Sequence, residues 1–262
     1  MYPVLFRIGS LTVDTYNVVW FIALLLAIWW VIRRLEIYGL DEYEARRIMA
    51  VSFFCMMIGA IIFKQLHRIP YIISNPSYLL KFQQWGVSEF GAVLGAFISA
   101  FVMCIFSRNI SFLRLCDAAA PPAMLAIAVG RWGCFFHGCC VGLPSKFFTA
   151  VHFPRDPAGL TRHPVQIYYS AIAIVIVFIL LRVERRILPR QKNSNRYYSV
   201  IAPMAMIMYT FMRFGVAVAR DYHPFSWLIA YSMTFKILTA VFPFLCLWLA
   251  YSLLRLKSAE SI

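Results

Sequence analysis

The sequence predicts an all-α membrane protein, a polytopic bundle of about seven transmembrane helices. Of its 262 residues, 62% are hydrophobic and only 14% are charged, and the mean hydropathy is +0.73. Soluble domains are closer to about 45–50% apolar and 25% charged, and a soluble domain of this size does not bury so much apolar surface. The apolar residues also fall into runs of about 20, the length of one membrane span.

The same composition excludes several classes of protein. It rules out a single soluble domain, a disordered chain and a nucleic-acid-binding protein. A net charge of +14 is typical of a chain that binds nucleic acid or anionic lipid. The high apolar fraction favours anionic membrane lipid as the partner. No stretch is left for a large soluble domain, so we expect residues 1–262 to form a single integral membrane domain.

Seven hydrophobic runs, each bounded by charged or turn residues, are expected to be helices, because backbone amides in lipid must be satisfied within their own segment. They cover residues 16–32, 49–66, 86–106, 119–141, 164–182, 197–217 and 227–253. The first run follows Asp14 and ends at Arg33 and Arg34; it is too long for a cleaved signal peptide and is expected to stay as an anchor. The fifth opens at Pro164, which suits a first helical turn. The polar, basic residues 189–196 are expected to form a loop.

The loop charges predict the orientation. Fourteen of the 25 lysines and arginines fall in one set of alternate loops, eight in the other set and three inside the runs. Because cytoplasmic loops are enriched in Lys and Arg, the N-terminus is expected outside and the C-terminus in the cytoplasm. All five histidines then lie on or near the outer side: His67, His137, His152, His163 and His223. We therefore expect the chemistry at the outer leaflet.

Arg131 is the most informative residue, because it is a charge inside the fourth run. Such a charge costs on the order of 3 kcal/mol on the most lenient scale, so it usually faces a polar site or partner. Four glycines surround or follow it, including Gly130 and Gly133. A planar guanidinium suits a phosphate clamp. The alternative is a structural arginine that reaches the interface, but that alternative does not need the flanking glycines.

Arg213 and Arg220 lie seven residues apart and therefore on one helical face. Two deep arginines on different spans, Arg131 and Arg213, would hold one phospholipid head group between them. Arg220 near the outer interface is also consistent with an ordinary anchor. Lys236 in the seventh run is either a third cation or an interface residue.

Cys134, Cys139 and Cys140 gather around His137. Their spacing fits no standard zinc pattern, which pairs two cysteines with a second pair, so no metal site is expected. Simple packing, a disulfide in an oxidising compartment and a nucleophilic cysteine remain open.

The start of the fifth run is rich in polar side chains. His163, Gln166 and Tyr168 place hydrogen-bonding groups at the outer membrane surface. An aromatic interface belt explains Tyr168 and Tyr169, but it does not explain His163 or Gln166.

Together these motifs resemble the bacterial prolipoprotein diacylglyceryl transferases along nearly the whole chain. The motifs that carry the resemblance are Gly130-Arg131-x-Gly133 followed by Gly138 and Gly142, then Arg162-His163-Pro164-x-Gln166-x-Tyr168, then Arg213-Phe214 with Arg220, preceded by Asp14-Thr15-Tyr16 and the glycine-rich stretch from Gly86 to Gly95. The resemblance implies a transferase of the bacterial cytoplasmic (inner) membrane that needs no cofactor. It implies transfer of the diacylglyceryl group of phosphatidylglycerol to the lipobox cysteine of a lipoprotein precursor, with release of glycerol 1-phosphate.

The resemblance also implies roles for individual residues. Arg131 and Arg213 would hold the phosphate and stabilise the charge of the leaving group, and His163 is a candidate base. The substrate-binding residues implied are Tyr16, Gly130, Gly133, Gln166, Tyr168 and Arg220.

Several positions depart from the family pattern. Phe90 stands where the family has a histidine in its third span, Cys134 replaces an asparagine, and Cys139, Tyr169 and Ala217 replace acids. Three hypotheses therefore stay open: a true lipoprotein diacylglyceryl transferase whose base is His137, His163 or Glu89 or whose arginines alone activate the thiol, a divergent relative with a different acceptor, and a non-enzymatic lipid-binding or transport protein.

Overall fold

The computed structural model describes residues 2–8, 11–66, 68–80, 85, 88–107, 110–154, 156–192, 197–220 and 224–259. The chain divides into two compact units. Unit 1 consists of Met1–Arg34 and Cys116–Ile262, and unit 2 is Leu35–Leu115. The expectation of one integral membrane domain over residues 1–262 stays a prediction.

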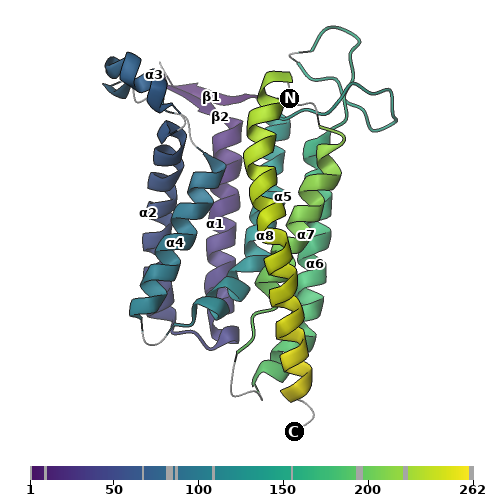
Figure 1. The fold of residues 1–262 in the computed structure, drawn as a ribbon. Helices are drawn as coiled ribbons and strands as arrows, with labels where there is room; N and C mark the ends of the chain where they lie inside the picture. Colours follow the sequence, from purple (N-terminus) through teal and green to yellow (C-terminus); the bar gives the residue numbers. More distant parts are fainter. Residues whose placement is uncertain are drawn as a thin grey trace. The chain divides into compact units, whose positions relative to one another are not determined.

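Every predicted run corresponds to a helix. The helices are α1 (Thr15–Leu35), α2 (Glu42–Leu66), α4 (Glu89–Phe106), α5 (Phe112–His137), α6 (Val165–Lys192), α7 (Ile201–Ala217) and α8 (Pro224–Ala259) (Figure 1). Five segments are long and apolar enough to cross a membrane: Thr15–Tyr38, Glu42–Leu66, Phe112–His137, Val165–Pro189 and Ala240–Lys257. Two shorter apolar helices, Gly91–Phe106 and Ile201–Ala217, cover the remaining two runs. The prediction of an all-α polytopic membrane protein is therefore confirmed.

Several predicted boundaries are wrong. Helices α2 and α5 begin at Glu42 and Phe112, earlier than the runs that start at residues 49 and 119. The fourth run was expected to reach residue 141, but α5 ends at His137 because Gly138 turns the chain with φ +73°. The loop expected at 189–196 begins later, since α6 continues through Pro189 to Lys192, and residues 193–196 lie outside the described residues. A proline this close to a helix end removes one backbone donor, and the preceding arginines are good helix formers.

The sequence runs also left short elements unpredicted. Strands β1 (Val4–Ile8) and β2 (Leu11–Asp14) form an antiparallel hairpin before α1. The hairpin is joined to the helix by the Thr15 amide, which donates to the Pro3 carbonyl at 3.1 Å. Unit 2 adds a short helix, α3 (Ile69–Ser74), and two 3₁₀ turns, η1 (Glu36–Tyr38) and η2 (Pro76–Leu80).

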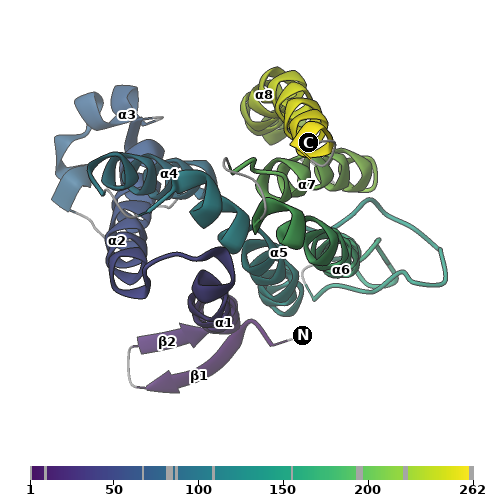
Figure 2. The ribbon, with the colours of Figure 1, turned by 90° about the horizontal axis from the view of Figure 1, so that it is seen from below.

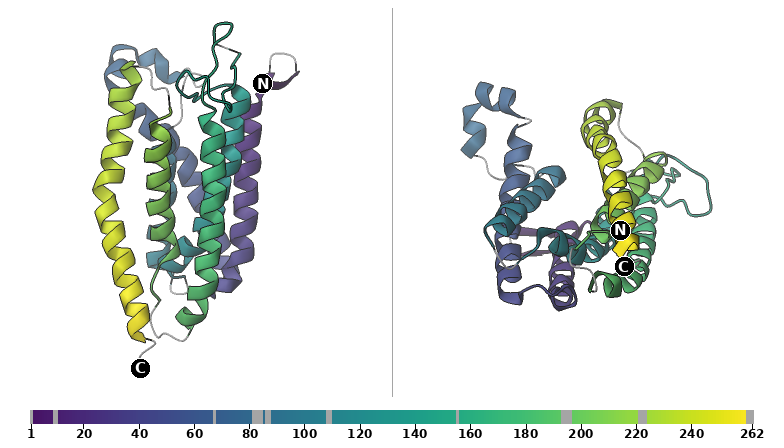
Figure 3. Two further views of the ribbon diagram at one scale, coloured as in Figure 1. Left: turned by 90° about the vertical axis from the view of Figure 1, so that its right-hand side faces the viewer. Right: turned by 60° about the horizontal axis from the view of Figure 1, so that its bottom comes forward.

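In unit 1 the helices follow one another in the order α1, α5, α6, α7, α8 (Figure 2). The core lies between α5, α6 and α7, where apolar side chains from all three helices pack together. They include Met124 and Ala128 of α5, Tyr169, Ala173 and Leu180 of α6, and Ala205, Met212 and Val216 of α7. The α5–α6 connection forms a long loop at the end of the unit where α1 begins (Figure 3).

The opposite end of unit 1 holds buried charges that are fully bonded. Arg34, at the end of α1, forms an ion pair with Glu184 of α6 and donates through Nε to the Ala118 carbonyl at 2.8 Å. Asp117 of α5 accepts four hydrogen bonds at the start of α7. Its donors are the Tyr197 and Ser199 hydroxyls and the Val200 and Ala202 amides, at 2.7–3.1 Å. A buried carboxylate is stable here because each of its oxygens has partners.

Unit 2 depends on the close pairing of α2 and α4. A Cβ atom at Gly91 would lie 2.4 Å from the Gly59 carbonyl oxygen, and one at Gly95 would lie 2.3 Å from the Cys55 carbonyl oxygen. Small residues that let two backbones touch are typical of helix pairs in membranes. Two glycines of the 86–95 motif thus have a packing role, while Gly86 lies outside the described residues.

Candidate functional site

The C-terminal end of α5 determines where the loop residues of unit 1 go. The Gly138 amide donates to the Phe135 carbonyl at 3.1 Å, and the Cys139 amide donates to the Cys134 carbonyl at 3.1 Å. These two bonds form a Schellman motif, in which the residue after the helix must be left-handed. Glycine adopts that conformation without a Cβ penalty. The chain therefore reverses and brings residue 139 back against residue 134.

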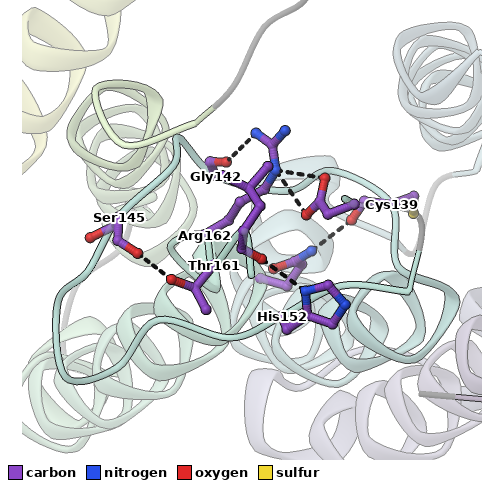
Figure 4. A network of polar contacts seen from close by, with 9 residues as sticks. Cys139, Gly142, Ser145, His152, Thr161 and Arg162 are labelled. Atoms are coloured by element: carbon purple, nitrogen blue, oxygen red, sulfur yellow. Dashed lines mark hydrogen bonds and ion pairs between the residues drawn. The ribbon is translucent and has the colours of Figure 1, made fainter. Parts of the chain in front are cut away.

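The loop that follows is held together by backbone pairing and by Arg162 (Figure 4). The Arg162 Nε atom lies 2.9 Å from both carboxylate oxygens of Asp156, and Nη1 donates to the Gly142 carbonyl at 3.2 Å. The Arg162 amide and carbonyl pair with Val151. Arg162 therefore has a structural role: it fixes the loop from Gly142 to His163.

Gly142 is the point where this loop meets the end of α7. Its amide donates to the His163 carbonyl at 3.1 Å, and it forms a β-bridge with Arg220. A Cβ atom at this position would lie 2.4 Å from the His163 carbonyl oxygen and 2.8 Å from the Ala219 carbonyl oxygen. Only glycine fits, and the close fit places Arg220 beside the residues that follow α5.

Arg131 is buried in unit 1, with 5% of its surface exposed. Its guanidinium carbon lies 4.4 Å from the centre of the Tyr169 ring, a cation–π distance. This position contradicts the alternative of an arginine that reaches the membrane surface. It also contradicts the assignment of Tyr169 to an interface belt, since Tyr169 is 1% exposed and lies in the core between α5 and α7.

The helices of Arg131 and Tyr169, α5 and α6, carry further buried polar atoms that the described residues leave unbonded. Gln166, 1% exposed, donates through Nε2 to the Cys139 carbonyl at 2.7 Å, but its Oε1 has no partner in the described part of the chain. The same holds for the Tyr169 hydroxyl and for Nδ1 of His137. Buried polar atoms are nearly always hydrogen-bonded. Atoms of this kind, on the two helices whose residues Arg131 and Tyr169 stack together, therefore indicate a place for a polar ligand.

His163 and Tyr168 form a second polar group at the start of α6. The His163 Nδ1 atom lies 3.1 Å from the Tyr168 hydroxyl, and that hydroxyl lies 2.7 Å from Thr149 Oγ1. Both ring systems are half-buried. The Tyr168 bond orients the imidazole, because it occupies one ring nitrogen and leaves Nε2 for other contacts.

Tyr16, Gly130 and Gly133 lie where α1 packs on α5. A Cβ atom at Gly130 would lie 2.7 Å from the Trp20 ring, and one at Gly133 would lie 3.2 Å from the Tyr16 carbonyl oxygen. The Tyr16 ring is 6.0 Å from the His137 ring, centre to centre. The two glycines therefore position helices, and they bring Tyr16 next to the end of α5.

Arg213 is half-buried on α7, between the core residues Met212 and Val216. The phosphate clamp shared by Arg131 and Arg213 stays a proposal. The side chains of Glu89, Phe90 and Lys236 and all of His67 and His223 lie outside the described residues.

The three cysteines converge in space, although their sequence spacing did not predict it. The sulfur atoms of Cys134, Cys139 and Cys140 all lie within 4.8 Å of one another. Hydrogen bonds from Cys134 and Cys139, with the positive charges of Arg220 and Arg131, hold the pKa of the Cys140 thiol well below its usual range. Cys139 donates to its neighbours, so its own pKa is raised.

Sequence reasoning missed two features of this site. Tyr169 supports Arg131, and the Cys139 carbonyl anchors Gln166. Gln166 and Tyr169 are three residues apart and therefore share one face of α6, and this spacing could have indicated that Tyr169 faces the site. Gly138 could have indicated the position of the Cys139 carbonyl, because a glycine after a helix marks the end of that helix.

Comparisons of the sequence with known proteins identify its family. The model of the prolipoprotein diacylglyceryl transferase family matches residues 3–252. A phosphatidylglycerol–prolipoprotein diacylglyceryl transferase of Clostridium novyi is 30% identical over 226 residues, 84% of each chain. Its namesake in Clostridium tetani is 30% identical over 81% of this chain and 86% of its own, and that of Aeromonas hydrophila is 28% identical over 84% and 78%. The chain belongs to the prolipoprotein diacylglyceryl transferase family.

Proposed function

We propose that this protein transfers the diacylglyceryl group of phosphatidylglycerol to the thiol of a lipobox cysteine in a lipoprotein precursor. Family membership over nearly the whole chain and the transferase names of its relatives support this function. The single observation that carries it is the buried Arg131 guanidinium, stacked on Tyr169 beside unbonded polar atoms of α6. Such a group suits an anionic phosphate and has no need of a cofactor.

In the proposed reaction, the thiol sulfur attacks the glyceryl carbon that carries the phosphate ester. A carbon–sulfur bond forms, the carbon–oxygen bond breaks, and glycerol 1-phosphate leaves with the bonding electrons. Arg131 stabilises the charge that grows on the phosphate, and Arg213 is the second proposed donor. Preformed charges in a site shielded from water stabilise such a transition state more than they do in water.

The thiol proton needs an acceptor, and His163 is the base that we propose. Its Nδ1 atom is engaged with the Tyr168 hydroxyl at 3.1 Å. When that bond runs from Nδ1–H to the hydroxyl, the lone pair lies on Nε2, where a base requires it. His137, at the end of α5, is the next candidate. Phe90, at the family's histidine position, has no group that accepts a proton.

The remaining proposed site residues contact the lipid around this centre. Gln166 presents Oε1 from α6, Tyr168 is oriented by Thr149, and Tyr16 lies beside His137. Arg220 is held next to the loop by its bridge to Gly142. Gly130 and Gly133 act by letting α1 approach α5.

We place the protein in the bacterial cytoplasmic membrane with its site toward the outer leaflet. The five long apolar segments support a multi-pass membrane protein. Within unit 1 the site lies at the end where α1 begins, while the end of α8 lies at the opposite end (Figure 1). The loop charges predict an external N-terminus, which puts that end of unit 1 outside.

The experiment combines the purified full chain with phosphatidylglycerol and a synthetic peptide that carries a lipobox cysteine. Mass spectrometry should detect a diacylglyceryl thioether on the peptide. A peptide with serine in place of the cysteine, and phosphatidylethanolamine in place of phosphatidylglycerol, serve as substrate controls. Arg131→Ala should lose the product, whereas Arg255→Ala, which removes an exposed arginine of α8, should keep it.

The other outcomes separate the remaining hypotheses. If phosphatidylglycerol binds in an Arg131-dependent way but the peptide stays unmodified, the acceptor is a different molecule. If the protein neither modifies the peptide nor binds the lipid, the transferase proposal is wrong.

A further inference from the structure

The end of α5 brings three thiols together in a way that the proposed transfer does not use. Cys134 lies in the last turns of the helix and is 3% exposed, while Cys139 and Cys140 follow the reversal at Gly138. The Schellman bonds return Cys139 to Cys134, and Cys140 adopts a left-handed φ of +59°. A residue with a side chain seldom adopts this conformation. The backbone is thus bent at two successive points, and all three sulfurs converge.

We propose that Cys134, Cys139 and Cys140 form a binding site for one soft metal cation of the Zn²⁺ or Cu⁺ class, held by three sulfur atoms. Thiolates select these cations over harder ones. Zn²⁺ lies about 2.3 Å from each thiolate sulfur, which puts tetrahedral ligands less than about 4 Å apart. The sulfurs here already lie within 4.8 Å of one another, so a small rotation of side chains completes the site.

The number of sulfurs favours a metal over a disulfide. A disulfide joins only two cysteines, so it does not explain why the third sulfur lies beside them. Cys139 and Cys140 are adjacent in the chain, and a bond between neighbours is a strained one. A metal instead uses all three sulfurs at once. Each thiol releases its proton to solvent when it binds, and a water molecule takes the remaining position on Zn²⁺.

The surrounding charges favour the same ligand. Three thiolates with Zn²⁺ carry a net negative charge, and with Cu⁺ they carry more. The guanidinium groups of Arg220 and Arg131 both act electrostatically on Cys140. They would offset the charge of the complex, as partners around a metal centre commonly do. Cys134 is buried, whereas Cys139 and Cys140 are half-buried.

The metal would also fix the loop on which the candidate site depends. The Cys139 carbonyl accepts the hydrogen bond from Gln166 Nε2, and Gly142 lies two residues after Cys140. Holding the sulfurs together restrains both contacts. Because a ligand that binds only the folded state stabilises it, metal should raise the melting temperature. This proposal does not rest on the transfer reaction.

The experiment uses the full chain, purified in detergent, reduced, and freed of reductant and metal without oxygen. Zn²⁺ and Cu⁺ are added in separate arms, unbound metal is removed, and the metal content is measured by elemental analysis. We expect about one metal per chain in at least one arm, with a rise in melting temperature. The two arms identify which cation the site prefers.

Substitutions show whether the three sulfurs are the ligands. Cys139→Ser and Cys140→Ser should each lower the affinity for the metal by at least about tenfold, because loss of an outer partner of a metal ligand alone costs that much. Cys134→Ser should do the same. Cys246→Ser, which changes a half-buried cysteine of α8, is the matched control and should bind like the unsubstituted protein.

A spectrum of the unsubstituted protein keeps the test decisive if a variant fails to fold. Co²⁺ added as an optical probe should give sulfur-to-cobalt charge-transfer bands whose intensity corresponds to three thiolates. Absence of bound metal in both arms overturns the proposal. So does unchanged metal content in the Cys139→Ser/Cys140→Ser double variant, or a mass decrease of two hydrogens from disulfide formation while metal is present.

Discussion

The two ends of unit 1 treat buried polar groups differently. At the end of α1, Arg34 is paired with Glu184, and Asp117 accepts four hydrogen bonds from the start of α7. At the other end, Arg131 stacks on a tyrosine ring, and Gln166 Oε1 and the Tyr169 hydroxyl lack partners in the described part of the chain. Both ends are buried, so burial alone does not distinguish them.

The difference lies in how fully each polar group is bonded. At the Arg34 end the buried charges of the described residues bond to one another and to the backbone, and these bonds hold α1, α5, α6 and α7 together. Incomplete bonding at the Arg131 end has a cost in stability, because buried polar atoms without partners have lost their water. This loss of stability is expected at a binding site, because a bound ligand supplies the missing hydrogen bonds. The comparison predicts that substitutions at the first end change stability and those at the second change activity.

The largest expected effect is at the Arg34–Glu184 pair. Glu184→Ala leaves a buried guanidinium without its carboxylate, and we expect a loss of about 3–5 kcal/mol in the free energy of unfolding. Denaturant unfolding in detergent measures this loss. The double variant Arg34→Met/Glu184→Leu, which removes both charges, should recover most of it. Equal losses in the single and double variants would contradict the account of the pair.

Arg131→Ala should act on the reaction. Removing one preformed donor to a developing oxyanion typically lowers the rate by roughly 100- to 1000-fold. We expect a loss of that size in transfer of diacylglyceryl to the peptide, measured per folded protein. Arg131→Lys keeps the charge but not the planar fork, so its activity should lie in between. If Arg131→Ala retains full activity, the two ends of the unit do not differ in the way described.

Gly142→Ala tests the junction between the loop and α7. The new Cβ would meet two backbone oxygens, at 2.4 and 2.8 Å, and overpacking of this kind costs about 1–3 kcal/mol. The control is Gly215→Ala, because Gly215 of α7 has open space around the position of a Cβ. Thermal unfolding should show a lower melting temperature for the first variant and no decrease for the second.

The smallest expected effects come from removing one hydroxyl at each end of unit 1. Ser199→Ala removes a hydroxyl that donates to Asp117 at 2.7 Å, and it should cost about 1 kcal/mol. Tyr169→Phe removes a hydroxyl without a partner in the described residues, so stability should stay the same or rise, while transfer activity falls. Unfolding and activity measured on both variants test this difference, and a clear loss of stability in Tyr169→Phe would contradict it.

The helices were predictable because the length and composition of each hydrophobic run indicate a helix without any knowledge of its tertiary contacts. The faces of the helices were not. Tyr169 belongs to a stretch of α6, residues 167–181, in which nearly every residue is apolar. In such a stretch the pattern does not show which face meets protein and which meets lipid. The burial of Tyr169 against α5 and α7 therefore had to come from the structure. The same applies to Arg34 and Glu184, which lie 150 residues apart in the chain.

The candidate site was only partly predictable for the same physical reason. Polar side chains in or beside a membrane span are costly and usually functional. This rule identified Arg131, Gln166, His163 and Tyr168. Their partners come from elsewhere: a tyrosine from the facing helix holds Arg131, and the Cys139 carbonyl holds Gln166.

By itself, the sequence determined the class of the protein, its helical segments and the polar residues that lie among them. These properties follow from local composition, because the cost of burying a charge or an unbonded amide in lipid is paid residue by residue. Tertiary structure alone decided which buried charges are paired, which polar atoms remain available and that three cysteines meet. These contacts depend on a helix reversal and on packing between distant segments, which no local pattern specifies.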